Sequence, residues 1–181
     1  KKDLEKIILC DVPTKIYPDL ESSFLSLIHN SGHPSIKLEK SIKALIHSSK
    51  NIEWGAIKLV SHEKPDNLPD KITHEFCPPM TNINEWNYAA IYELPKHVDT
   101  EFAMLIHDDG FVVNPESWRP EFLDYDYIGA PWPLPATNDK VSYRAIDGEL
   151  IRVGNSVSLR SKKLLDLPIK INLEWKPFHG F

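Results

Sequence analysis

The 181-residue sequence predicts an α/β fold with a mainly parallel sheet flanked by helices. One observation is the short continuous apolar run from Phe102 to Ile106, which is typical of a strand that is covered on both faces. Another is that strand-like segments alternate with segments whose apolar residues recur every three or four positions. In addition, polar residues follow the predicted strands, and ligands bind beyond the carboxyl ends of strands in open α/β sheets.

Composition bounds the class of protein. Hydrophobic residues make up 41% of the chain and charged residues 26%, as is usual for a globular domain, and we expect a single domain over residues 1–181. The formal net charge of -5 argues against nucleic acid and anionic membranes as partners. No apolar run approaches the ~18 residues of a membrane span, so we expect a cytoplasmic protein. The abrupt end at Phe181 suggests that the native chain continues.

Four elements are predicted in the first half of the chain. They are a strand over 6–10, a helix over 19–30, a second helix over 36–46 and a strand over 56–60. The proline-rich segment 65–81 is predicted to be irregular. Asp11 and Thr14 follow the first strand, and they fit either a ligand site at the edge of the sheet or an ordinary turn.

The second half continues the alternation. A helix is predicted to begin near Asn82, and the strand 102–106 follows it. Asn114 and Pro115 are typical of a helix cap and the first position of a helix. Further predictions are a short strand within 122–129, a polar loop over 138–149, a strand over 150–153, and a helical pattern that begins at Ser161.

The central candidate site directly follows the strand 102–106. His107, Asp108 and Asp109 come where that strand should end, and Gly110 lets the chain turn away. Carboxylates at this edge are placed to hold a cation or a polar ligand. A solvated loop without a ligand is the other interpretation, because aspartate is common in turns.

Two further segments carry candidate binding residues. Trp132 lies in a proline-framed loop and fits either a stacking platform for a sugar ring or a core position. The small residues from Gly154 onward permit close approach of a ligand to the backbone. Arg160 lies beside the predicted start of a helix, and this arrangement fits a diphosphate or carboxylate site as well as a strand and helix without a ligand.

Three motifs in the same order resemble a poorly characterised glycosyltransferase-like family. Its typical patterns are Q-x-D-G-F, a tract ending in YDYIGAPW, and G-N-G-G-F-S-L-R-S. The corresponding segments here are 107–115, 122–133, 153–155 and 158–161. The resemblance covers about the C-terminal half of the chain. It implies a GT-A-like, Rossmann-like mixed sheet, in which a divalent metal and a D-x-D-type motif hold a nucleotide-sugar diphosphate.

The resemblance also implies roles for single residues. Asp109 matches the motif's aspartate and is the main candidate metal ligand, with His107 and Asp108 as further candidates. Donor contacts are implied for Asp11, Thr14, Asp108, Asp109 and Arg160. The sugar or acceptor side is implied for Trp132, Gly154, Asn155 and Ser158. Two departures matter: the paired glycines of the third motif are replaced by Ser156 and Val157, and the chain ends before the acidic pair that the family tends to carry.

From these features we expect a metal-dependent, hexosyltransferase-like glycosyltransferase that uses Mn or Mg. Its donor would be a UDP- or GDP-linked sugar, and its acceptor a glycan or another hydroxyl compound. A non-catalytic module that binds a nucleotide sugar or glycan is the alternative. A metal-dependent hydrolase is a weaker third interpretation, because no further ligand cluster is found in the sequence.

Overall fold

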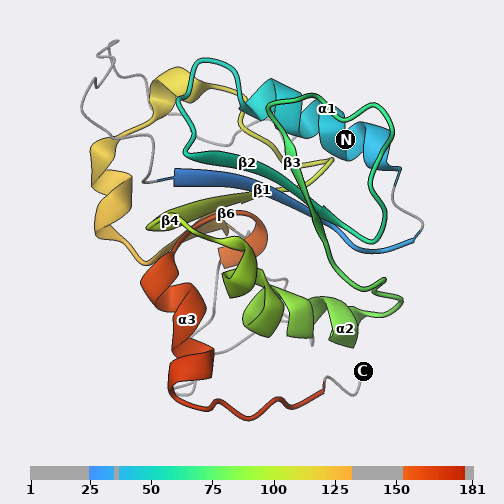
Figure 1. Ribbon diagram of the computed structural model, residues 1–181. Coiled ribbons are helices and arrows are strands. Elements are labelled where there is room, and N and C mark those ends of the chain that lie inside the picture. Colours follow the sequence, from blue (N-terminus) through green and yellow to red (C-terminus); the bar gives the residue numbers. More distant parts are fainter. Residues whose placement is uncertain (1–24, 35–36, 132–152, 178–181) are drawn as a thin grey trace, which may run out of the picture.

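The computed structural model describes residues 25–34, 37–131 and 153–177 (Figure 1). Within these ranges six strands form one sheet in the order β3-β2-β1-β4-β6-β5. The strands are β1 (Leu25–Ser31), β2 (Ala56–Ser61), β3 (Thr73–Phe76), β4 (Phe102–Ile106), β5 (Tyr127–Pro131) and β6 (Val153–Ser161).

The sheet is mixed and mainly parallel. β1 pairs in parallel with β2 on one side and with β4 on the other, and β3 extends the parallel part beyond β2. β6 is antiparallel to both of its neighbours, β4 and β5. The predicted Rossmann-like α/β fold class is therefore confirmed. The assignment of residues 1–181 to a single domain stays a prediction.

Helices cover both faces of the sheet. Figure 1 shows α1 (Leu38–Ser48) on one face, and α2 (Ile83–Tyr88) and α3 (Lys162–Lys170) on the other. α2 continues through a π-helical segment, Ala89–Glu93, and a 3₁₀ turn, Leu94–His97. Two more 3₁₀ turns, Pro115–Ser117 and Pro120–Asp124, connect β4 to β5. No helix of the described part is long and apolar enough to cross a membrane.

Each face of the sheet has its own apolar core. Successive side chains of a strand point to opposite faces, so neighbouring residues of β1 enter different cores. Leu27 packs with Leu45 of α1, whereas Ile28 packs with Leu165 of α3. In β4, Ile106 belongs to the core beneath α1 and Leu105 to the core of the other face. Because side chains alternate along a strand, the face on which each of these residues lies determines the face of the polar residue that follows it.

Local sequence explains the helices that frame the site. α1 buries Ser41, Ala44, Leu45 and Ser48, the spacing of one helix face, so the prediction of a helix over 36–46 is confirmed. At the end of β6 the Ser161 hydroxyl accepts the Leu164 N–H, which caps α3 as the helical pattern from Ser161 predicted. Asn114 likewise caps the turn Pro115–Ser117.

Two predictions in the first half are wrong. The segment predicted as a helix over 19–30 contains β1, whose side chains are buried on both faces, and this burial outweighs the helical spacing of Leu27 and Ile28. The segment predicted as irregular over 65–81 contains β3, a four-residue edge strand with no fully buried side chain. The strand predicted over 6–10 and the loop over 138–149 lie outside the described residues.

Candidate functional site

The site is built at the carboxyl ends of β1 and β4. These strands are parallel neighbours, and the chain leaves β1 through α1 to reach β2 on one side, whereas β4 lies on the other side. Open α/β sheets bind ligands beyond the carboxyl ends of their strands, where the connecting loops meet. The predicted motif after β4 therefore lies at the position that the fold makes available.

A tight turn presents the two aspartates. The His107 N–H donates to the Gly110 carbonyl at 2.7 Å, which closes the turn with Asp108 and Asp109 exposed at its tip. Gly110 is required for packing, because a Cβ there would lie 2.6 Å from Cγ2 of Val157 on β6. This glycine brings the turn against β6, the strand that carries Arg160.

Helix α1 fixes the continuation of that turn. The Val112 N–H donates to Ser48 Oγ at 3.0 Å, and Phe111 contacts His47 edge to face with ring centroids 5.2 Å apart. Ser48 is fully buried on α1. The loop after β4 is therefore held by polar and aromatic contacts although its own residues are largely exposed.

His29 lies buried at the end of β1. Ser31 Oγ donates to Ser41 Oγ at 2.8 Å, so the 2.7 Å contact between Ser31 Oγ and His29 Nδ1 has the imidazole N–H as donor. His29 Nε2 is then a bare acceptor, and it is buried without a hydrogen-bond partner among the described residues. Burial, helped by the nearby His107 and opposed by Asp108, lowers the pKa of His29 to about 4. His29 is therefore neutral near pH 7.

His107 points to the other face of the sheet. Its ring centroid lies 6.1 Å from that of Trp86 on α2 and 6.1 Å from that of His29. Burial lowers the pKa of His107, the neighbouring aspartates raise it, and the charge of Arg160 lowers it further. The net shift is downward, so near pH 7 His107 is a neutral imidazole with one donor and one acceptor at the end of β4.

Arg160 is a buried cation on β6. It is only 9% exposed, its Nε donates to Ser158 Oγ at 3.1 Å, and its guanidinium carbon lies 5.4 Å from the centroid of the Tyr127 ring. The Tyr127 hydroxyl in turn donates to the Gly154 carbonyl at 2.9 Å. No Asp or Glu of the described residues forms an ion pair with Arg160, and burial lowers the pKa of its guanidinium. A guanidinium remains protonated at neutral pH, so the site holds a desolvated positive charge.

The predicted metal ligands do not form a complete metal site. Among the described residues, no three His, Cys, Asp or Glu side chains are placed to hold a metal ion together. Asp108 and Asp109 are exposed, and His107 is turned toward Trp86. Metal ligation by these three residues stays a prediction. The residues that the structure describes supply too few ligands on their own, and a bound substrate could supply others.

The other predicted site residues divide into two groups. Ser158 and Arg160 are in contact, and Gly154 is joined to them through Tyr127. Asp11, Thr14 and Trp132 lie outside the described residues, as does the side chain of Asn155, although its backbone belongs to β6. The predicted roles of the residues in this second group stay predictions.

Sequence reasoning missed His29, although a signal for it was present. The segment 24–32 reads Phe-Leu-Ser-Leu-Ile-His-Asn-Ser-Gly, and the segment 102–110 reads Phe-Ala-Met-Leu-Ile-His-Asp-Asp-Gly. Both follow the pattern F-x-x-L-I-H, then two polar residues and glycine. In the sheet the two segments are offset by one residue, because His29 pairs with Ile106 and not with His107. The offset places the two histidines on opposite faces.

Comparisons with known proteins show no family for this chain. No family model matches it. A stretch of 42 residues is 69% identical to the putative protein-export protein SecB of Pelagibacter ubique (strain HTCC1062). That stretch is 23% of this chain and spans only 30% of the length of that relative. A match of this extent leaves the site residues without a family assignment.

Similar solved structures share the fold. One is 4-diphosphocytidyl-2C-methyl-D-erythritol synthase of Anaerococcus prevotii DSM 20548, which is 13% identical with a TM-score of 0.51, over 88% of this chain and 79% of that chain. Another is the bifunctional IspDF of Campylobacter jejuni, which is 15% identical with a TM-score of 0.48, over 85% of this chain and 45% of that chain. At 13% identity the first likeness establishes the Rossmann-like fold and no more.

This finding corrects the predicted chemistry. The first of these structures is named as a diphosphocytidyl-compound synthase and not as a glycosyltransferase, so the prediction of a metal-dependent glycosyltransferase is contradicted. The prediction followed from three sequence motifs. A mixed α/β sheet alone does not specify the reaction, because one fold can host enzymes of different chemistry. The site must therefore be interpreted from its own side chains.

Proposed function

We propose that this protein is a nucleotide-binding enzyme of the nucleotidyltransferase type, which binds the phosphates of its substrate near the carboxyl ends of β1 and β4. The observation that carries the proposal is the buried Arg160, which no carboxylate among the described residues neutralises. A desolvated guanidinium is costly without an anion, and its planar donors match phosphate oxygens. The similar fold of a diphosphocytidyl-compound synthase supports the choice of a nucleotide as the source of that anion.

Neutral donors and acceptors beside Arg160 fit such a ligand. His107 is uncharged near pH 7 and can donate one hydrogen bond to a phosphate oxygen. Ser158 already accepts the Nε–H of Arg160, which holds the guanidinium plane in one orientation. The arrangement is preorganised, because Tyr127 and Ser158 fix the cation before a ligand arrives.

The reaction would be transfer of a nucleotidyl group. An acceptor oxygen would attack the α-phosphorus of a nucleoside triphosphate, the bond to the bridging oxygen of the β-phosphate would break, and pyrophosphate would leave with the electron pair. Arg160 would offset the negative charge that grows on the phosphate oxygens in this step. No proton has to move when the acceptor is an ionised phosphate, so the neutral histidines need not act as general bases.

A divalent cation fits the exposed carboxylates only together with substrate. Asp108 and Asp109 would supply one or two ligands, and phosphate oxygens and waters the others, which is the usual way that proteins hold Mg²⁺. When bound, such an ion would neutralise phosphate charge. The proposal for Arg160 does not depend on it.

The test is a thermal-shift measurement with nucleoside triphosphates and nucleotide sugars, with and without Mg²⁺. A ligand at 100 times its dissociation constant stabilises the protein by about 2.7 kcal/mol, which raises Tm by roughly 5–10 °C for a chain of this size. We expect that shift for wild type and for the control variant Arg119→Met, and its loss in Arg160→Met. Pyrophosphate release on addition of a phosphorylated alcohol would then report transfer. The absence of any nucleotide-dependent shift in wild type would refute the proposal.

A further inference from the structure

A pocket of about 570 Å³ lies next to His107, beyond the end of β1, and has no assigned role. Its lining residues are His33, Met80, Thr81, Asn82, Ile83 and Trp86. They come from the loop after β1, from the connection between β3 and α2, and from the first turns of α2. Figure 1 shows that connection running along one edge of the sheet down to α2. The volume is within the range of sites that bind small molecules.

The walls of the pocket are fixed to the end of β1. The Met80 N–H donates to the Gly32 carbonyl at 2.9 Å. Gly32 has no room for a side chain, because a Cβ there would lie 1.9 Å from Met80 Cε and 3.1 Å from Cys77 Sγ. The loop after β1 is thus held tightly to the far wall, and the pocket does not depend on a loose surface loop.

The polar groups on the rim are largely used within the protein. The Thr81 N–H and hydroxyl both donate to a Glu85 carboxylate oxygen, at 2.6 and 3.0 Å. Asn82 Oδ1 accepts the N–H groups of Asn84 and Glu85 at 3.0 Å each. The contacts that remain for a ligand come mainly from the Trp86 ring, the Met80 thioether and Ile83. Such a surface suits a flat, weakly polar ring.

Trp86 joins this pocket to the proposed phosphate site. Its ring lines the pocket and also contacts His107 edge to face, and the charge of Arg160 acts on that same histidine. A ligand that spans both places would carry a flat ring at one end and an anionic group at the other. A nucleotide has this composition.

We infer that the pocket takes the base of the nucleotide, stacked on Trp86 and Met80. The inference rests on the proposed function for its phosphate end, whereas the pocket itself is defined independently of Arg160. It places the base on the α2 side of β1 and the phosphates at the Arg160 guanidinium, near the carboxyl end of β4.

The test is calorimetric titration of the full chain with three probes: a nucleoside triphosphate such as CTP or ATP, the matching nucleoside, and inorganic tripolyphosphate. Trp86→Leu removes the ring on which the base would stack. This variant should bind the nucleoside triphosphate with about 5- to 150-fold lower affinity and should bind tripolyphosphate with the affinity of wild type. Trp86→Phe should restore most of the affinity. Arg160→Met should lower the affinity for both the nucleoside triphosphate and tripolyphosphate.

Trp54→Leu is the matched control. Trp54 is also half-buried but packs against the core beneath α1, so this variant should bind all probes as wild type does. Circular dichroism of each variant separates loss of binding from loss of fold.

The outcomes distinguish the two proposals. Equal effects of Trp86→Leu on both triphosphates, or no effect, would overturn the base pocket while the phosphate site stands. In another outcome, wild type binds the nucleoside but not tripolyphosphate, and Trp86→Leu no longer binds the nucleoside. This result would support the base pocket and refute the phosphate site. No binding of any probe to wild type would overturn both.

Discussion

Two buried cations on the same face of the sheet have opposite surroundings. Lys58 on β2, 6% exposed, is 2.6 Å from a Glu75 carboxylate oxygen and 2.7 Å from one of Asp99. Burial lowers the pKa of Lys58, but its bonds to the two carboxylates outweigh that effect and the pKa is raised. Arg160 on β6 is comparably buried, yet it forms no ion pair among the described residues, and its side chain interacts with Ser158 and Tyr127.

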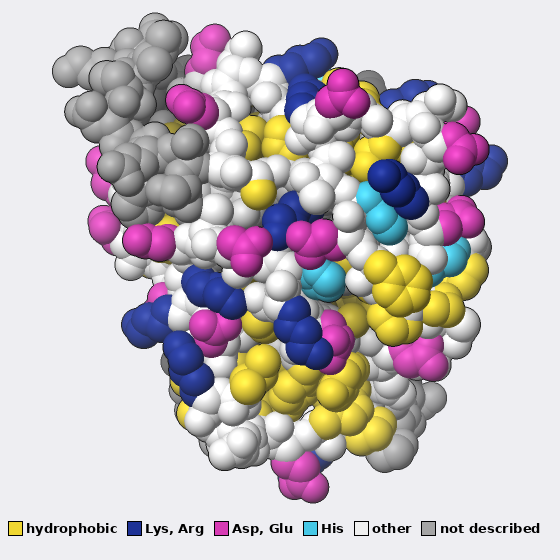
Figure 2. All heavy atoms as spheres, viewed as in Figure 1, with side chains coloured by type: hydrophobic (Ala, Val, Ile, Leu, Met, Phe, Trp, Pro, Cys, Tyr) yellow, Lys and Arg dark blue, Asp and Glu magenta, His cyan; other side chains and the backbone are white. Residues whose placement is uncertain are grey.

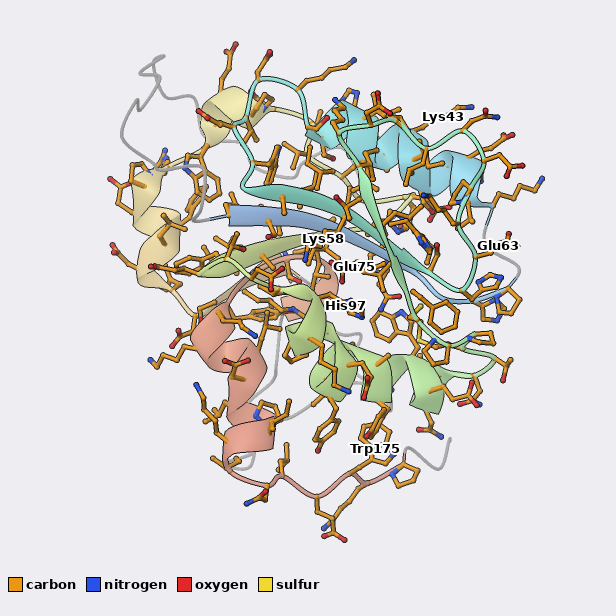
Figure 3. All side chains as sticks on the ribbon, in the orientation of Figure 1. Lys43, Lys58, Glu63, Glu75, His97 and Trp175 are labelled. Carbon is orange, nitrogen blue, oxygen red and sulfur yellow. The ribbon has the colours of Figure 1, made fainter. Side chains whose placement is uncertain are left out.

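The difference separates a structural charge from one available to a ligand. Lys58, Glu75 and His97 lie together in Figure 3, and Figure 2 shows basic, acidic and histidine side chains gathered at the same place. Glu75 also contacts His97, so the cluster joins β2 and β3 to the 3₁₀ turn after α2. Its charges are satisfied within the protein, and it has no need of an external ion. Arg160 has no carboxylate partner among the described residues, and a bound anion would supply the missing charge.

The largest expected effect concerns His29, another buried group, whose Nε2 has no hydrogen-bond partner in the part of the chain that the structure describes. Its pKa is about 4 in the folded protein and 6.5 in the unfolded chain, so the unfolded state binds more protons between these values. The free energy of unfolding should therefore fall as pH drops from 6.5 to below 4, by about 3 kcal/mol in total at 1.4 kcal/mol per pKa unit. Urea titrations of wild type and His29→Gln across this range measure it. Equal slopes in the two proteins would show that His29 does not titrate this way.

The next effect is on the compensated cation. Lys58→Met leaves Glu75 and His97 without the central charge, and we expect a loss of about 2 kcal/mol. This figure is below that for a fully buried pair, because Asp99 is exposed and screened by solvent. Lys43→Met, at an exposed position of α1 labelled in Figure 3, is the control and should change stability little. Denaturant midpoints report both. If Lys58→Met left the free energy of unfolding unchanged, Lys58 would not be a structural charge, and the contrast with Arg160 would be removed.

The smallest effect on stability is expected at Arg160 itself. Arg160→Met removes a desolvated charge and keeps an apolar side chain of similar length, so the free energy of unfolding should stay within about 1 kcal/mol of wild type. Nucleotide binding should be lost at the same time. A loss of stability as large as that of Lys58→Met would mean that Arg160 is part of the structural framework, and would weaken its assignment as a phosphate ligand.

The sequence predicted the elements whose burial is one-sided or whose ends carry capping residues. The face of α1, the cap at Ser161 and the apolar run of β4 were all evident from residue types and spacing. β1 was not, because Leu27 and Ile28 fit a helix as well as a strand and only the neighbouring strands decide between them. β3 was missed because an exposed edge strand has no apolar alternation to reveal it.

The site was predictable only in part for a similar reason. The turn after β4 and the residue Arg160 were found from the sequence, whereas His29 and Trp86 were not. Trp86 contributes through the packing of α2 near β4, and no local pattern encodes that proximity. The lack of a carboxylate partner for Arg160 within the described ranges was equally inaccessible from the sequence, because it depends on which carboxylates lie close in space.

The one-residue offset between β1 and β4 also limits how these strands can change in evolution. Deleting one residue before His29 would turn its ring from the α1 side to the side of His107 and move Ile28 into the opposite core. Removing two residues would preserve both faces. Insertions and deletions within β1 ahead of His29 should therefore be tolerated in even numbers. Relatives whose β1 is longer or shorter by a single residue should have lost either this histidine or the serine pair that holds it.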